Sequence, residues 1–357
     1  MDSLVFPKIT FGIIVLNGEP FTRYCLRSIY PFAYEIIVVE GGHVDAKSVC
    51  TPEGHSVDGT LEILYKFKKE EDPDNKLTIV TKEGFWPKKD EMGHDRTPQS
   101  RAFAERATGD YLWQIDIDEF YKEEDMYSII DMLKQDPSIT AVTFPFVSFW
   151  GDIIYKIEGW KFLRGGAFCH RLFKWGPGYK YITHEPPTIV NEEGVDLRNI
   201  NWISKKKLMK KDIYMYHYPQ LFPWQVRQKT MVYKDEKPDE CSDILEWADN
   251  NYFKLTNPFN IERHYWLPSW LVYYSGDHPA QVINMMRDVK SGEVKIELRN
   301  NSDVEKILGK KMYSVKTNLM KVYNGWDYYS KLLVFQLSRI KNIPGRIRRN
   351  LKSIKSK

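Results

Sequence analysis

The segment Ala107-Thr-Gly-Asp-Tyr-Leu-Trp-Gln-Ile-Asp-Ile-Asp-Glu119 carries the pattern that decides the fold. Its apolar centre, residues 111–115, predicts a buried strand that runs into acids. Because side chains alternate along an extended chain, we expect Asp116 and Asp118 to face one side while the neighbouring isoleucines point into the core. Two carboxylates so close disfavour joint ionisation unless a cation neutralises them, and oxygen ligands suit Mg²⁺ or Mn²⁺. A solvated acidic turn after a strand is the alternative interpretation.

Upstream of this segment, short apolar runs alternate with helical patterns. The predicted strands are residues 9–16, 35–39 and 77–80, and the predicted helices are residues 21–29, 61–67 and 97–107. Such alternation is typical of βαβ units that build a mostly parallel sheet. Open α/β sheets bind their ligands at the carboxyl ends of the strands. The residues that follow the strands are therefore the first candidates for a site: Asn17-Gly18-Glu19, Glu40-Gly41-Gly42, Thr81-Lys82 and the acids from Asp116 to Glu119.

From Ser138 onward the pattern changes. Residues 140–149 and 169–174 are rich in strand formers, and the sequence beyond Trp224 is helical in pattern and rich in aromatic residues. The sequence shows no internal repeat and no low-complexity linker. We therefore predict an α/β protein with a catalytic domain over residues 1–235, a helical, aromatic-rich extension over residues 236–337 and a basic tail over residues 338–357.

The composition bounds the class of protein. With 42% hydrophobic and 28% charged residues, the 357-residue chain is not mainly disordered. No apolar run approaches the roughly 18 residues of a membrane span, and the N-terminus lacks the basic-then-apolar pattern of a secretory signal. The four cysteines stand far apart without a CxxC pair, so we expect free thiols rather than a zinc site or a disulfide framework. These features predict a cytoplasmic protein.

The net charge conceals an asymmetry between the body of the chain and its tail. Residues 338–357 contain eight Lys or Arg and no acid, and without them the chain has 44 basic and 48 acidic residues. Nucleic acid is therefore not an expected partner. The basic residues of the tail alternate with apolar ones, a composition that suits an anionic membrane surface and predicts a peripheral location at the inner face of the membrane. A disordered, solvated tail is the alternative.

The acidic segment resembles the Asp-x-Asp region of glycosyltransferase family 2, whose members have the GT-A fold. Residues 9–17 resemble the opening strand of the family, and Glu35-Ile-Ile-Val-Val-Glu40 resembles its strand that ends in a nucleotide-binding acid. Ser56-Val-Asp-Gly-Thr60 is similar to the family's Ser-Thr-Asp-Gly-Thr helix start. Glu40 departs from the usual Asp, and residues 43–55 are an insertion where the family runs straight on. The resemblance implies a GT-A type sheet, mostly parallel and flanked by helices.

Arg171-Leu-Phe-Lys174, followed by Tyr181-Ile-Thr-His184-Glu185, resembles a subgroup of these enzymes with an Asp-x-Asp-Glu motif and a later His-Glu pair. An inverting sugar transfer needs a carboxylate that takes the proton of the acceptor hydroxyl as it attacks the anomeric carbon. Glu185 is the first choice for this base, with His184 beside it. Glu119 is the competitor because it extends the aspartate motif. The alternative interpretation makes Glu185 a surface acid and His184 a packed turn residue.

By the same resemblance His217, in Tyr214-Met-Tyr-His217-Tyr-Pro219, joins Asp116 and Asp118 as a metal ligand, and a hydrogen-bonded core histidine is the alternative. Further residues are implied in binding the donor nucleotide and its diphosphate, because they follow the strands, belong to the Ser56-Val-Asp-Gly-Thr60 helix start or lie on the helix after the third strand. They are Leu16, Asn17, Glu19, Glu40, Asp58, Arg101 and Asp116.

These features predict an inverting glycosyltransferase of the hexosyltransferase kind. It would move a sugar from a nucleotide-diphosphate donor to a glycan or lipid-linked acceptor of the cell envelope, assisted by Mn²⁺ or Mg²⁺. A sugar nucleotidyltransferase is one alternative, although it usually carries a glycine-rich basic loop where this chain has Asn17-Gly18-Glu19-Pro20. A non-catalytic sugar-nucleotide or membrane-docking module is the other.

Overall fold

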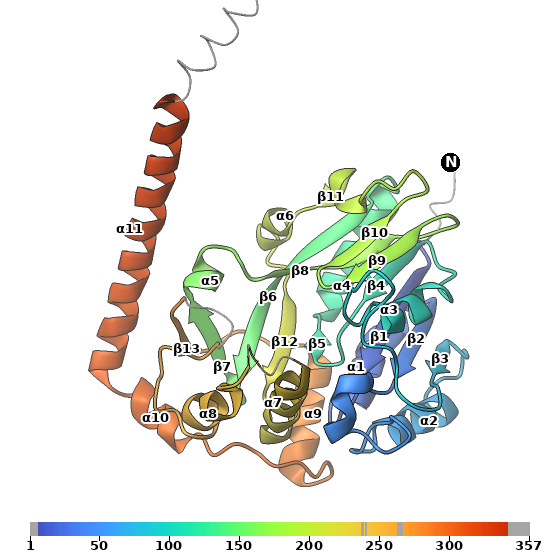
Figure 1. Ribbon diagram of the computed structural model, residues 1–357, viewed down its shortest axis with the longest axis horizontal. Coiled ribbons are helices and arrows are strands. Elements are labelled where there is room, and N and C mark those ends of the chain that lie inside the picture. Colours follow the sequence, from blue (N-terminus) through green and yellow to red (C-terminus); the bar gives the residue numbers. More distant parts are fainter. Residues whose placement is uncertain (1–5, 237–238, 240, 263–266, 342–357) are drawn as a thin grey trace, which may run out of the picture.

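The computed structural model describes residues 6–236, 239, 241–262 and 267–341. An 11-stranded mixed sheet forms its centre, helices cover both faces of that sheet, and a two-stranded sheet lies beside it (Figure 1). The predicted α/β class is therefore confirmed.

Parallel strands form the N-terminal part of the large sheet, in the order β4-β1-β2-β3. They are β1 (Ile9–Val15), β2 (Glu35–Glu40), β3 (Leu77–Val80) and β4 (Tyr111–Gln114). The helices between them are α1 (Thr22–Ile29), α2 (Thr60–Glu70) and α3 (Thr97–Ala104), with the 3₁₀ turns η1 (Tyr30–Phe32) and η2 (Val44–Val49). Each predicted strand and helix of this region is present, with ends that differ by at most a few residues.

The other part of the large sheet is built around one long strand, β6 (Ala141–Trp150). Strand β8 (Phe168–Lys174) joins the two parts, since it pairs antiparallel with both β4 and β6. The remaining strands of this sheet are β5 (Glu119–Phe120), β7 (Asp152–Gly159), β11 (Trp202–Ile203), β12 (Met215–Gln220) and β13 (Ser269–Tyr273). Strands β9 (Lys180–His184) and β10 (Pro187–Val190) form the small sheet.

Most of the later chain is helical. The helices in the middle of the chain are α4 (Glu123–Gln135), α5 (Trp160–Leu163), the 3₁₀ turn η3 (Leu197–Asn199) and α6 (Lys205–Met209). The later helices are α7 (Pro223–Glu236), α8 (Ile244–Ala248), the π-helical η4 (Asp249–Phe253), α9 (Ala280–Ser291), α10 (Ser302–Leu308) and α11 (Lys311–Lys341). The predicted C-terminal helical extension is present, and it also contributes β13, which pairs antiparallel with β7 at the edge of the large sheet.

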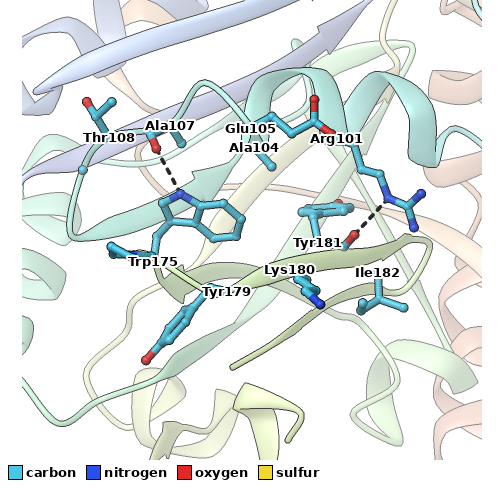
Figure 2. A pocket seen from close by; sticks show the side chains of 13 residues that line it. Arg101, Ala104, Glu105, Ala107, Thr108, Trp175, Tyr179, Lys180, Tyr181 and Ile182 are labelled. Carbon is cyan, nitrogen blue, oxygen red and sulfur yellow. Dashed lines mark hydrogen bonds between the residues drawn. The ribbon is translucent and has the colours of Figure 1, made fainter. Parts of the chain in front are cut away.

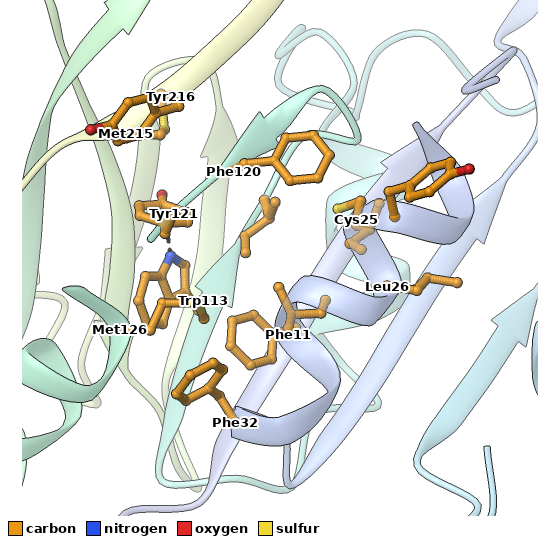
Figure 3. Packing of buried hydrophobic residues seen from close by; sticks show 14 of the residues in the cluster. Phe11, Cys25, Leu26, Phe32, Trp113, Phe120, Tyr121, Met126, Met215 and Tyr216 are labelled. Carbon is orange, nitrogen blue, oxygen red and sulfur yellow. Dashed lines mark hydrogen bonds between the residues drawn. The ribbon is translucent and has the colours of Figure 1, made fainter. Parts of the chain in front are cut away.

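Alternation along the strands creates a core on each face of the sheet. On one face, the ring of Trp113 stacks between Phe11 and Phe144, with ring centroids 5.4 and 5.3 Å apart, in a cluster that also contains Phe32 and Met126 (Figure 3). On the other face, Phe103 of α3 packs against strand residues such as Leu112. Because apolar clusters cover both faces of the sheet, polar functional residues are expected in the loops at the ends of its strands.

Helix α11 stands apart from the rest of the molecule over its C-terminal part (Figure 1). Its N-terminal part rests on the body, where Trp160 donates to the carbonyl of Met320 and Arg164 pairs with Asp327. None of the helices within the described residues combines the length and hydrophobicity that a membrane span requires. Of the predicted basic tail, residues 342–357 lie outside the described residues.

Candidate functional site

The acids after β4 lie in a turn rather than in an extended segment. Strand β4 ends at Gln114, and the backbone N–H of Glu119 donates to the carbonyl of Asp116 at 2.9 Å. The expected alternation of Asp116 and Asp118 along a strand is therefore wrong, because this hydrogen bond reverses the chain between them. Glu119 begins β5, whose pairing sets it opposite His217 of β12. The turn therefore brings the acids and His217 together by a different route from the predicted one.

Arg171 lies between two of these acids. Antiparallel pairing of β4 with β8 brings its buried guanidinium to Asp116, at 2.5 Å, and to the carboxylate of Glu119. Although burial raises it, the pKa of Asp116 is held below its usual range by the charge of Arg171. For Glu119, burial outweighs Arg171 and raises the pKa to about 7. Although both carboxylates contact Arg171, their pKa values shift in opposite directions, and Asp116 is the one of the two that is fully ionised at pH 7.

Asp118 has different neighbours, which come from β12 and α7. The ammonium Nζ of Lys229 lies 3.2 Å from its Oδ2, and Nε2 of His217 lies 3.5 Å from its Oδ1. Burial would raise the pKa of Asp118, but the charges of Lys229 and His217 lower it well below its usual range. Asp118 is therefore an ionised carboxylate with a cation already beside it.

The predicted metal ligands are close together but do not form a ready-made metal centre. Within the described part of the chain, no group of three or more His, Cys, Asp or Glu side chains gathers in a metal-binding arrangement. Two carboxylates and an imidazole are nevertheless donors that suit Mn²⁺ or Mg²⁺. The residues fit a divalent cation by type. In this arrangement Arg171 and Lys229 supply the positive charge that the acids require.

His184 is the last residue of β9, and Glu185 follows it in a turn. The ring Nδ1 of His184 lies 2.8 Å from the hydroxyl of Ser100, and its ring is buried. Burial lowers the pKa of His184 to about 4 despite the opposing charge of Asp116, so the imidazole is neutral at pH 7. Glu185 is exposed, and with Tyr233 and Glu236 it raises the pKa of Arg96 against the effect of burial. The two residues therefore have different surroundings: His184 is buried and neutral, whereas Glu185 is open to solvent.

Glu40, which was predicted to bind the nucleotide, is fully buried and already paired. Its Oε1 accepts from the backbone N–H of Ser56, and its Oε2 lies 2.8 Å from Nδ1 of His55. His55 belongs to the insertion at residues 43–55, and the insertion also places His43 at 2.7 Å from Glu236 of α7. The insertion thus fixes the loop after β2 and connects it to α7, a role that the sequence did not indicate.

The residues after β1 hold the neighbouring loops in place. Asn17 donates to the carbonyl of Val49 and to Gln228 of α7, both at 2.7 Å. Asp58 accepts from the backbone of Glu19 at 2.9 Å and from that of Thr60 at 3.0 Å. Gly59, between Asp58 and α2, has a φ of 93°, which favours a residue without a side chain. These contacts explain why Ser56-Val-Asp-Gly-Thr60 opens a helix.

Glu19 and Arg101 have contrasting surroundings. Burial raises the pKa of Glu19 to about 7, and its Oε1 is buried without a hydrogen-bond partner among the described residues. Arg101 instead pairs with Asp90 at 2.9 Å and donates to the carbonyl of Tyr181. Leu16 is half-buried between Val15 and Asn17. Glu19 therefore remains a candidate for a ligand contact, whereas Arg101 is occupied.

Helix α7 lies in the region predicted to be helical, but its contribution to the site was not predicted. It contributes Gln228 to Asn17, Lys229 to Asp118 and Glu236 to His43, so it spans the loops after β1, β2 and β4. Lys229 follows the predicted ligand His217 by 12 positions and lies in a region with a helical pattern. No local motif marks it, and only the return of the chain after β12 brings it to the acids. Arg171 was part of a quoted motif, but its pairing with the acids was not predicted.

Two cavities lie in different places. One of about 220 Å³ adjoins the acids and is lined by residues of β6, β12, α7 and α8, among them Phe146, His217, Lys229, Tyr233 and Trp247. The other, of about 690 Å³, lies where β4 begins, at the far end of the strands from the acids. Figure 2 shows its lining, in which Trp175 donates to the carbonyl of Ala107 and Arg101 donates to that of Tyr181. The smaller cavity is the one that belongs to the candidate site.

No family model and no curated protein matches this chain. Among solved structures, it is similar to residues 1–349 of S. aureus TarS, with 13% identity over 72% of this chain and 76% of that one and a TM-score of 0.34. It is similar also to the mannosyltransferase PcManGT from Pyrobaculum calidifontis, solved with GDP-Man and Mn²⁺, with 13% identity over 90% of this chain and 85% of that one and a TM-score of 0.35.

A third similar structure is glucosyl-3-phosphoglycerate synthase from Mycobacterium tuberculosis, solved with Mn²⁺ and UDP. It is 19% identical over 40% of this chain and 44% of that one, with a TM-score of 0.26. Because these TM-scores are low, the fold class rests on the strand order of this chain, and the assignment of a function rests on the geometry of the site itself.

Proposed function

We propose that this chain is a GT-A type glycosyltransferase that transfers a sugar from a nucleotide-diphosphate donor to an acceptor hydroxyl, with inversion at the anomeric carbon. One observation carries the proposal: Asp116 and Asp118 meet His217 and the neutral His184 at the carboxyl edge of parallel strands. Open α/β sheets bind their ligands at this edge. The resemblance of the acidic segment to family 2 supports the same conclusion.

Asp116, Asp118 and His217 are the residues that would hold Mn²⁺ or Mg²⁺. A bound divalent cation neutralises negative charge on a departing diphosphate. The chain also has its own cations at this place. Lys229 lies beside Asp118, where its ammonium can attract diphosphate oxygens, and Arg171 keeps Asp116 ionised and oriented. In this proposal, Asp116 and Asp118 bind the cation, while Lys229 and Arg171, which already pair with them, help to bind and orient the donor.

We assign the general base to Glu185. The acceptor hydroxyl must reach a carboxylate from solvent, and Glu185 is exposed at the end of β9, next to the buried His184. Glu119, the competitor, is 1% exposed and paired with Arg171, so an acceptor hydroxyl has no open route to it. In this assignment Glu119 orients Arg171 through their ion pair, and His184 is a buried, neutral residue of the wall of the site.

Donor contacts are assigned to the loops after β1 and β2. Glu19, whose buried Oε1 has no hydrogen-bond partner among the described residues, is assigned a polar contact to the donor, and Leu16 is assigned an apolar contact to the nucleotide base. Asn17 is assigned to hold the donor loop through its bonds to Val49 and Gln228. Glu40 and Asp58 act indirectly, because they accept hydrogen bonds from the backbone N–H groups of Ser56 and Thr60 and so fix the loop between them. Arg101 pairs with Asp90, and we assign it no donor contact.

The acceptor is assigned to the cavity of about 220 Å³ beside His217, where aromatic side chains such as Phe146 and Trp247 suit the apolar faces of a sugar ring. A glycan or lipid-linked acceptor of the cell envelope fits such a site. The proposed location is the cytoplasmic face of the membrane, with the basic tail, residues 338–357, contacting anionic lipid. Residues 1–235, 236–337 and 338–357 remain our proposed division into catalytic domain, extension and tail.

The test is a panel of nucleotide sugars incubated with the full chain, with and without Mn²⁺, while release of free nucleoside diphosphate is measured. We expect one donor to be turned over with Mn²⁺ and not with saturating EDTA. Asp118→Asn should abolish release, whereas the matched control Asp110→Asn should not, since Asp110 precedes β4 and binds the backbone of Lys8. A panel without turnover and without saturable binding would contradict the proposal.

A further inference from the structure

We propose that two copies of this chain associate through α11, whose outward face forms one side of an antiparallel coiled coil. The face consists of large apolar side chains that recur in alternating steps of three and four residues. We call this set the α11 seam, and its members are Met312, Val315, Leu319, Val322, Trp326, Tyr329 and Leu333.

The α11 seam is exposed to solvent along its whole length. Its side chains are between 51% exposed, at Val315, and 76% exposed, at Trp326. The opposite side of the helix rests on the body, where Tyr313, Thr317 and Asn324 are buried. Nothing in the described part of the chain covers the seam. A soluble surface helix normally places charged residues outward, so an outward stripe without a single charge calls for a partner.

The spacing of the seam identifies the kind of partner. Steps of three and four residues average 3.5, which is the period that keeps one stripe facing another helix in a left-handed coiled coil. The seam spans three heptads, which corresponds to about 32 Å of helix. Seven half-exposed to three-quarters-exposed side chains on each of two helices bury roughly 1,000 Å² in total, which reaches the size of a specific interface. A second copy of the same helix meets these requirements.

A membrane surface is the competing partner, and the flanks of the seam argue against it. A helix that lies on anionic lipid carries basic residues along the borders of its apolar face. From residue 311 to residue 333 the positions that border the seam are Lys311, Lys316, Asn318, Tyr323, Gly325, Ser330 and Leu332. Two lysines among seven do not supply that attraction, whereas the small residues Gly325 and Ser330 allow another helix to approach.

Charge and volume select the antiparallel orientation. In a parallel pair in register, Lys311 of one helix would face Lys316 of the other, and this repulsion would occur twice. Trp326 would also face its own copy. A two-fold axis between residues 320 and 321 of antiparallel helices instead sets large side chains against smaller ones, as a packed core requires. The facing pairs are then Val315 with Trp326, Met312 with Tyr329 and Leu319 with Val322.

The first test is the mass of the full chain in solution by sedimentation equilibrium and light scattering at micromolar concentration. We expect twice the 42.2 kDa of one chain. The double variant Leu319→Glu/Trp326→Glu should be a monomer with unchanged far-UV circular dichroism. Tyr65→Glu on α2 is the matched control, since it removes an exposed aromatic residue outside the seam, and it should stay dimeric.

A monomeric wild-type chain, or a seam variant that stays dimeric, would overturn the proposal. A monomer that sediments with vesicles containing phosphatidylserine, and loses this property in the seam variant, would overturn it in favour of a membrane surface.

Cross-linking tests the orientation. An oxidised mixture of the Val315→Cys and Trp326→Cys variants should form a disulfide-linked dimer, whereas Trp326→Cys alone should not, and oxidised wild-type protein controls for the native cysteines. Cross-linking of Trp326→Cys alone would show a parallel pair and overturn the antiparallel arrangement.

Discussion

Lys229 Nζ lies 3.2 Å from Oδ2 of Asp118, the acid that the Asp-x-Asp motif marks as a metal ligand. A protein ammonium thus stands beside the carboxylate at which a divalent cation would bind. Because Lys229 belongs to α7, the charge of the site depends on how this helix is docked.

Removing the charge of Lys229 should strengthen metal binding. In Lys229→Met, Asp118 loses a competing cation, and we expect the affinity for Mn²⁺ in the absence of nucleotide to rise roughly three- to tenfold. Isothermal titration calorimetry measures this directly. Lys234→Met, an exposed lysine on the same helix, is the matched control and should leave the affinity unchanged. Weaker Mn²⁺ binding in Lys229→Met would show that the ammonium does not compete with the metal.

Asp118→Asn should weaken donor binding in the presence of Mn²⁺ far more than Asp110→Asn does. The first change removes an anionic oxygen ligand, whereas Asp110 holds the backbone of Lys8 at the other end of β4. Turnover should fall with binding, since the cation then sits less firmly. Equilibrium binding of the preferred nucleotide sugar measures the difference, and undiminished binding of the wild-type chain in EDTA would contradict it.

Glu185→Gln should keep donor affinity near that of the wild type while transfer falls by roughly 10²- to 10⁴-fold, the usual scale for a positioned base. Single-turnover transfer with a saturating donor measures the loss.

Glu119→Gln is the comparison. It removes a partner of the buried Arg171, so we expect loss of stability together with donor binding rather than a selective loss of transfer. If Glu119→Gln loses transfer selectively and Glu185→Gln retains it, the base is Glu119.

Glu236 should make the docking of α7 sensitive to acid. Burial would raise its pKa, but His43 and Arg96 lower it from 4.5 to about 2. A depressed pKa in the folded state contributes stability above the unfolded value, and this contribution disappears as the pH falls from about 4.5 towards 2. Glu236→Gln should therefore lower the Tm at pH 7 and have little effect near pH 2. Thermal unfolding at both pH values checks this, and an equal effect at each would contradict it.

Deleting residues 338–357 should release the protein from anionic vesicles without reducing transfer to a soluble acceptor. Each basic residue near such a surface contributes about 1 kcal/mol at best, so added salt should weaken the binding of the full chain. Equal sedimentation of the full and truncated chains with the vesicles would favour a solvated tail.

The N-terminal elements could be predicted because their signals are local. Hydrophobic period, the turn Asp58-Gly59-Thr60 and the proline at the start of α3 each act within a few residues, and β3 was predicted with its observed ends. The grouping of Asp116, His184 and His217 was expected from the resemblance to family 2 and not from the strand pattern, since His184 ends a strand of the small sheet and His217 lies within β12.

The remaining parts of the site depend on contacts between distant residues. Lys229 reaches Asp118 across 111 positions, and Arg171 reaches Asp116 across 55. Neither separation leaves a pattern in a single sequence. The turn after β4 was missed for a related reason, because β5 exists only through its pairing with β12, a strand from far along the chain. Pairings of this kind decide whether an acid is extended, buried or neutralised.

The pairing of β13 with β7 bears on how the protein can be divided. If the chain were cut after residue 235, β7 would become an open edge of the large sheet. Its backbone N–H and C=O groups would then face water beside buried side chains such as Tyr155 and Ile157. Exposed edges of this kind recruit strands from other molecules. An isolated N-terminal fragment should therefore self-associate and precipitate, and work on catalysis needs β13 kept in the expressed chain.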